Sequence, residues 1–67
     1  MYIYEDHLGG LYTSVHELSY EETYCEQCRD SDWLIGYAAN RADAWELLKD
    51  DWNPEYVKRF IVYNWEE

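Results

Sequence analysis

The sequence predicts an α+β fold, with a small antiparallel sheet of three to four strands and one main helix packed on a face. Three observations lead to this prediction. Two strand-like runs flank Gly9-Gly10, an apolar run lies at 32–38, and a segment at 40–52 has the spacing of an amphipathic helix. Polar turn residues separate these segments, as is typical of short elements joined by tight connections.

The first two strands are expected to form a hairpin within YIYEDHLGGLYTSVHE. A Gly-Gly dipeptide supplies the positive φ values that a two-residue hairpin turn requires. With Gly9 and Gly10 as that turn, Leu8 faces Leu11, and alternate side chains share a face. The predicted core face carries Tyr4, Leu8, Leu11 and Val15. The other face carries Ile3, Glu5, His7, Tyr12, Ser14 and His16.

Two alternatives stay open for residues 19–28. Ser19 followed by Glu22 is a capping-box pattern, which predicts a helical turn beginning near Tyr20. Tyr24 to Gln27 also reads as a strand that turns through 29–32 into the next strand. Single-sequence reasoning on such short segments does not decide between them.

The middle of the chain predicts a strand followed by the clearest helix. The run from Asp32 to Ala38 is apolar and bounded by polar residues, with Gly36 as a candidate bulge. Asn40 is a good helix N-cap, and Asp43 is placed to accept from the open amides of the first turn. The apolar residues that follow recur at three- and four-residue spacing; they are Ala44, Trp45, Leu48 and Trp52.

The last segment is predicted to begin as a helical turn and to end as a strand. Asn53-Pro54 closes the preceding helix, and it also suits the cap and first position of a new helical turn at about 54–58. Phe60 to Trp65 is dense in β-branched and aromatic residues, which favours a terminal strand.

Length and charge restrict the classes of function. A chain of 67 residues makes one domain, 1–67, near the lower size limit for a self-sufficient core. Its net charge is -10, and residues 1–28 hold six acidic residues and no Lys or Arg. Such a surface repels phosphate backbones and anionic lipid headgroups, so direct nucleic-acid or membrane binding is not expected.

The aromatic content predicts a folded, interacting protein. Four Trp, eight Tyr and one Phe are too many for so small an interior to hide. Exposed Tyr and Trp are enriched at protein interfaces, although Tyr also tolerates half-exposed strand positions. With no apolar stretch near the 20 residues of a membrane span and no signal-peptide pattern, we expect a cytoplasmic protein with reduced cysteines.

Cys25 and Cys28 form a C-x-x-C pair, the one motif here with a named chemistry. Zinc in a structural site takes four Cys or His ligands, and the chain has four candidates in all. The predicted hairpin places His7 and His16 about 13 Å apart, too far to share one ion. Arg29 also stands where a metal knuckle normally has Gly. A metal at Cys25 and Cys28, with zinc as the cofactor, is thus the less favoured reading beside two reduced structural thiols.

No residue pattern in the sequence indicates a catalytic site. A redox C-x-x-C needs an activated thiolate, and the charge of Glu26 between the cysteines disfavours it. The Asp30-Ser31-Asp32 segment lacks the ligands of a calcium loop and is expected to be a turn. No nucleophile and base pair is specified by spacing, so we expect a non-enzymatic protein.

Acidic residues give the leading functional hypothesis. A solvated face that maintains solubility is the simpler interpretation. Alternatively, carboxylates on a rigid aromatic scaffold imitate the phosphates of a nucleic acid and occlude the basic groove of a nucleic-acid-binding protein. The predicted partner-binding residues are Glu17, Glu21, Glu22, Glu26, Asp30, Asp32, Asp50 and Asp51.

The segments YCEQC, DSDWLIGYA and ADAWELLKDDW resemble small acidic proteins encoded by phages and prophages of Gram-positive bacteria. That group carries a Tyr-Cys-x-x-Cys-Gly-Asp-Ser-Asp segment and then a helix with an Ala-Trp-Glu-Leu-Leu core. The likeness covers Tyr24 to Trp52, and Arg29 departs from the group's Gly. The resemblance implies a phage-type protein that acts by binding a host or phage protein, and it transfers no catalytic residues.

Overall fold

The fold is α+β, as predicted. The structure is a computed structural model that describes residues 1–65. Its main sheet has three antiparallel strands in the order β2-β1-β5, formed by β1 (Tyr2–Glu5), β2 (Leu11–Ser14) and β5 (Trp33–Tyr37). The central strand β1 therefore lies between the first hairpin partner and the strand predicted at 32–38.

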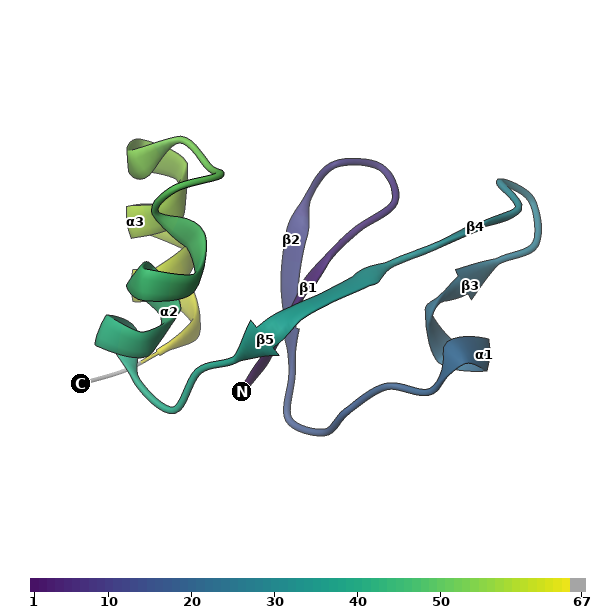
Figure 1. The fold of residues 1–67 in the computed structure, drawn as a ribbon, viewed down its shortest axis with the longest axis horizontal. Coiled ribbons are helices and arrows are strands. Elements are labelled where there is room, and N and C mark those ends of the chain that lie inside the picture. Colours follow the sequence, from purple (N-terminus) through teal and green to yellow (C-terminus); the bar gives the residue numbers. More distant parts are fainter. Residues whose placement is uncertain (66–67) are drawn as a thin grey trace.

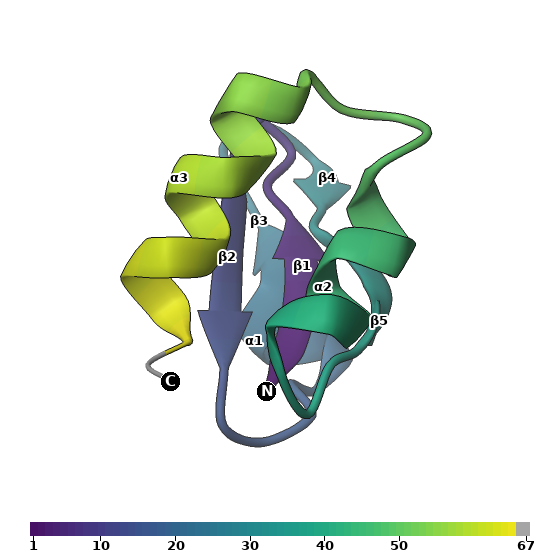
Figure 2. The same ribbon diagram turned by 90° about the vertical axis from the view of Figure 1, so that its left-hand side faces the viewer.

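Two helices cover one side of this sheet (Figures 1 and 2). They are α2 (Arg41–Leu48) and α3 (Pro54–Asn64). The predicted cap of α2 is confirmed, since the Asn40 side chain accepts a hydrogen bond from the Asp43 backbone at 2.9 Å. No helix within the described residues has the length and apolar character to cross a membrane.

A smaller unit lies on the other side of the sheet (Figure 1). It consists of α1 (Tyr20–Thr23) and a two-stranded sheet of β3 (Tyr24–Cys25) and β4 (Asp30–Ser31). The two alternatives for residues 19–28 both hold in part. Ser19 caps a helical turn by accepting from Glu22, and a short strand follows directly. The expected turn at 30–32 is wrong, because residues 30–31 pair with β3.

The core lies between the main sheet and the two helices. It is built from Ile3 of β1, Ala38, and apolar positions of α2 and α3, with Met1, Leu11, Ile35, Trp45, Leu47, Trp52 and Phe60 packed around it. Its buried members are Ile3, Ala38, Ala44, Leu48, Val57, Ile61 and Trp65. All of these come from outside residues 15–33, so the smaller unit adds nothing to this core.

The predicted hairpin register is wrong. Ile3 pairs with Thr13, and the turn spans residues 6–10 instead of two glycines. The Asp6 backbone closes this loop by donating to Gly10 at 2.7 Å, and the Asp6 side chain accepts from Leu8. Local bonding by an Asp side chain thus sets a longer turn, in which Gly9 alone has a positive φ, of 94°.

This register changes which side chains are buried. Ile3 lies in the core, while Leu8 and Val15, both predicted core residues, are 78% and 82% exposed. Tyr4 is buried on the opposite face of β1, where its ring stacks on Tyr12 with centroids 5.4 Å apart. The central strand is therefore covered on both faces.

The bulge in β5 is displaced by one residue from its predicted position. Ile3 pairs with Gly36 and Tyr4 with Leu34, which leaves Ile35 as the extra residue. Gly36 instead leaves room for a side chain of α2, because a Cβ atom at this position would lie 3.0 Å from a methyl of Leu47. A glycine at this position lets α2 approach the sheet.

The predicted terminal strand is also wrong, because Phe60 to Trp65 continues helix α3 as far as Asn64. The Asn53 side chain caps this helix by accepting from the backbone N–H groups of Glu55 and Tyr56, and Pro54 takes the first helical position. Val57, Ile61 and Trp65 recur every four residues and are all buried. Burial of this stripe outweighs the strand preference of the individual residues.

Replacing Val62 with alanine tests this correction. Val62 is 61% exposed on α3, and alanine is the better helix former, so the substitution is expected to raise the free energy of unfolding by about 0.5 kcal/mol. Urea unfolding measures this change. Ile61→Ala is the matched control, expected to lose about 2–4 kcal/mol. A lower stability of the Val62 variant would contradict the helix, since alanine is disfavoured in strands.

Candidate metal centre

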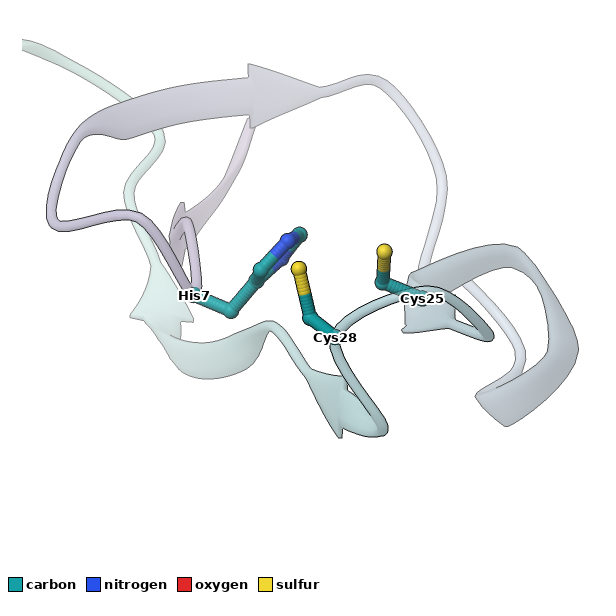
Figure 3. A group of neighbouring side chains, drawn as sticks. All are labelled: His7, Cys25 and Cys28. Carbon is teal, nitrogen blue, oxygen red and sulfur yellow. The ribbon is translucent and has the colours of Figure 1, made fainter.

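Three potential metal ligands meet where the main hairpin faces the smaller unit. His7 lies in the loop after β1, Cys25 ends β3, and Cys28 lies in the turn before β4. One ligand atom from each side chain lies within 4.8 Å of the other two. Figure 3 shows the imidazole and both sulfurs directed into the same space. The pair of cysteines thus acquires a histidine partner that the predicted register did not provide.

The turn from β3 to β4 contains a residue in the left-handed backbone region. Cys25 pairs with Asp30, so residues 26–29 form a tight connection from β3 to β4. Arg29 has a φ of 55°, in the left-handed region that favours glycine. Arg29 therefore takes, at a cost of roughly 1–2 kcal/mol, a backbone conformation that the Gly normally found at this position of a knuckle adopts freely.

Hydrogen bonds make the two thiols unequal. The backbone N–H and the thiol of Cys28 both donate to Cys25, with a further backbone bond from Gln27, and they lower the pKa of Cys25 against the effect of burial. The same bond to Cys25 raises the pKa of Cys28, as do the nearby charges of Asp30 and Asp6. For Cys25 the bonds from Cys28 are thus the main cause of a pKa below its usual value.

Asp32 orients the histidine. One of its carboxylate oxygens accepts from the His7 backbone at 3.0 Å and from His7 Nδ1 at 2.8 Å, and the other accepts from the Tyr12 hydroxyl at 2.5 Å. A carboxylate only accepts, so Nδ1 carries the proton. The remaining nitrogen, Nε2, then has its lone pair free for a metal, which is the usual arrangement of ligating histidines.

The pKa values follow from these bonds. The hydrogen bond to Asp32 is the main cause that raises the pKa of His7. Burial raises the pKa of Asp32, but bonds from Tyr12 and His7 outweigh it and leave that pKa below its usual value. Burial, followed by the bond to Asp32, raises the pKa of Tyr12. The group is thus a charged carboxylate held between a phenol and an imidazole.

This coupling predicts a pH dependence of stability for the metal-free protein. Because its pKa is higher in the folded state, protonated His7 stabilises the fold fully below pH of about 6.5, and the effect is lost as pH rises through the raised pKa. Urea unfolding of the parent and His7→Gln in chelator, from acid to alkaline pH, measures the difference. It should shrink as pH rises; a difference that grows with pH would contradict the assignment.

The second histidine stays apart from the cluster. His16 Nε2 lies 3.5 Å from a carboxylate oxygen of Glu22, and both side chains are more than half exposed. Among the described residues, His16 belongs to no group of three potential metal ligands. The expected separation of the two histidines holds, although it arises from a different hairpin.

The predicted partner-binding acids occupy different parts of the molecule. Those of the smaller unit and its approach are exposed: Glu17, Glu21, Glu22, Glu26 and Asp30. Asp50 and Asp51 are exposed in the turn after α2, on the other side of the main sheet (Figure 1). Asp32 is partly buried and bonded to His7 and Tyr12. Five of the eight acids therefore lie on the smaller unit or the segment leading to it, and Asp32 is instead bonded to the hairpin.

No family model matches this sequence, and no curated protein or solved structure is detectably similar to it. The donor atoms of His7, Cys25 and Cys28 and the distances between them indicate which ion this cluster suits.

Proposed function

We propose that the chain is a non-enzymatic domain whose smaller unit is held to the main sheet by a metal ion bound to His7, Cys25 and Cys28. The observation that carries the proposal is the convergence of these three donors, with Asp32 fixing the imidazole tautomer that leaves Nε2 available. The sequence offered the two cysteines as metal ligands only in its less favoured interpretation, and His7 adds a third donor to that pair.

Zinc fits these donors best. Two thiolates and one imidazole are a ligand set that zinc takes readily, whereas calcium and magnesium require oxygen ligands. Tetrahedral zinc with Zn–S bonds of about 2.3 Å places its sulfurs roughly 3.7 Å apart. The ligand atoms lie within 4.8 Å of one another, so a contraction of about 1 Å completes the geometry.

The lowered pKa of Cys25 favours metal binding. Zinc binds thiolate, and the amides that lower the pKa of Cys25 reduce the cost of deprotonating it. Zinc binding to Cys28 would release the proton now shared with Cys25. Two thiolates neutralise the charge of the ion, so the bound centre adds no charge to its surroundings.

The smaller unit needs such a staple because it has little apolar packing. Within residues 15–32, Thr23 is the one buried residue, at 8% exposure. Its links to the main sheet include the bond from the Leu18 amide to the Tyr4 hydroxyl and the bonds of Asp32 to the hairpin. A metal would supply the cross-link that small domains otherwise obtain from a larger core or disulfides.

Three ligands leave one tetrahedral position. Among residues 1–65, no further His, Cys, Asp or Glu lies within the same distance of all three donors. Water would fill that position in the isolated chain, and Cys28 is on the exposed side of the cluster. The binding of another protein by the surrounding acids, including imitation of a nucleic acid, stays a prediction alongside this proposal.

Cobalt titration tests the proposal. Co²⁺ substitutes for zinc and gives intense sulfur-to-metal charge-transfer absorption when thiolates bind it. The reduced full-length chain should take up one Co²⁺ with this absorption, and zinc should displace it because zinc binds thiolate sites more tightly. Absence of charge-transfer absorption under reducing conditions would refute a thiolate metal site.

A further inference from the structure

Helix α3 presents a second surface, far from the cysteines, that differs in charge from the rest of the chain. Three hollows run along this helix, one against β2, one on its outer face and one against α2. Three of the chain's five basic residues line them, whereas none of their described lining residues is one of its fifteen acids. We call this the α3 surface; it comprises Trp45, Tyr56, Lys58, Arg59, Val62 and Tyr63.

The α3 surface is apolar and exposed between its basic residues. Val62 and Tyr63 are 61% and 87% exposed, and Tyr56 is 43% exposed. Val57 and Ile61, on the other side of the same helix, are buried. Single exposed apolar residues are normal, but adjoining ones beside hollows mark an interaction site.

The hollow against β2 has fixed walls. The Thr13 hydroxyl donates to Asn64 at 2.9 Å, and the Leu11 backbone donates to the Tyr56 hydroxyl at 3.2 Å. Figure 2 shows α3 running alongside β2. The hollow measures about 580 Å³, which is large enough for one or two side chains of a partner. The hollow is therefore formed by this chain alone, without a partner.

The charges of the α3 surface are available to a partner. Within residues 1–65, Lys58 and Arg59 form no ion pair, whereas Lys49 is paired with Glu46 at 2.8 Å. Arg41, at the edge of the hollow against α2, is held by the Trp65 carbonyl. Two unpaired cations beside an apolar floor complement carboxylates that accompany apolar side chains.

We propose that the α3 surface docks a short acidic segment of a partner protein, with apolar side chains entering the hollows and carboxylates meeting Lys58 and Arg59. A peptide suits it better than a nucleic acid. The net charge of -10 repels a long phosphate backbone beyond the patch, whereas a short peptide need touch only the patch itself. The proposal does not depend on the metal.

Selection from a random-peptide library against the full-length chain tests this inference. The overall charge alone favours basic peptides, so the proposal makes the opposite prediction: enriched peptides should combine Asp or Glu with aromatic or aliphatic residues. Their affinity should fall at least about tenfold for a variant combining Lys58→Glu and Arg59→Glu. The control Lys49→Glu, also a charge reversal at an exposed lysine, should leave the affinity unchanged.

Several results would overturn the proposal that the α3 surface docks an acidic segment. Enrichment of basic peptides, failure to enrich any peptide, or equal binding by the double variant would overturn the proposal. Tighter binding of a single-stranded oligonucleotide than of every selected peptide would assign the surface to nucleic acid. The unfolding midpoint of each variant is measured beside its affinity, and single Arg59→Gln replaces the double variant if that one is unfolded.

Discussion

Replacing Cys25 with serine is expected to weaken zinc binding by more than about 100-fold, beyond the loss caused by residues that only support a ligand. Cys25 has the thiol whose pKa is lowered by backbone amides, and it is positioned by pairing with β4. A serine hydroxyl does not ionise at neutral pH and is a poor zinc ligand. Competition with a chromophoric chelator at fixed pH measures the change.

Glu26→Gln is the matched control for this substitution. It changes a residue between the cysteines and leaves both sulfurs and the turn in place, so zinc affinity should stay within a few-fold of the parent. Equal affinity of the Cys25→Ser variant and the parent would show that zinc binds elsewhere on this acidic chain. A large loss in the Glu26 variant would make that carboxylate a ligand, contrary to the assignment.

Removal of zinc is expected to raise amide hydrogen exchange of residues 16–32 by at least about tenfold, because the metal links the smaller unit to the main sheet. The core of the main sheet, α2 and α3 contains no residue from that segment. Protection of those helices should therefore change little. Exchange followed by mass spectrometry, with and without chelator, separates the two regions.

Exchange measured separately for each region shows whether zinc stabilises only the smaller unit or the whole fold. Uniform loss of protection across the described residues would mean that the metal supports the whole fold. Unchanged protection of residues 16–32 would contradict a structural role for the ion. Repeating the measurement on the Cys25→Ser variant, which should resemble the chelated protein in both conditions, separates metal loss from other effects of the chelator.

Elements defined by local bonding could be predicted from the sequence. Asn40 and Ser19 cap helices in the predicted way, since a cap requires only neighbouring amides. The apolar run at 32–38 forms strand β5, which its composition and polar borders predicted although its partner β1 is distant in the sequence. The error at Phe60 to Trp65 arose from composition, because β-branched residues favour strands unless a buried helical stripe overrides them. The four-residue spacing of Val57, Ile61 and Trp65 was the available signal.

The metal centre could not be predicted in full, because its residues are brought together by contacts between distant parts of the chain. His7 and Cys25 are brought together by the hairpin register, and the register depended on whether Asp6 or the glycines closed the turn. Asp32 was assigned to the acidic surface, since its contact with His7 joins residues 25 positions apart. The spacing of Cys25 and Cys28 was visible in the sequence, while their third ligand was not.

Exposed acids lie on both sides of the main sheet. Five belong to the smaller unit and its approach, while Asp50 and Asp51 follow α2 on the opposite side (Figure 1). The α3 surface differs in carrying Lys58 and Arg59, which form no ion pair within residues 1–65. The hollows of this surface are lined by none of the proposed metal ligands, so binding there is expected to be the same with and without zinc.

X-ray absorption at the zinc edge tests the metal centre most directly. With one zinc per chain, the account predicts two sulfur neighbours at about 2.3 Å, an imidazole nitrogen at about 2.0–2.1 Å, and one further light atom. A shell of oxygen and nitrogen alone, or one of four sulfurs shared between two chains, would contradict a centre formed by His7, Cys25 and Cys28.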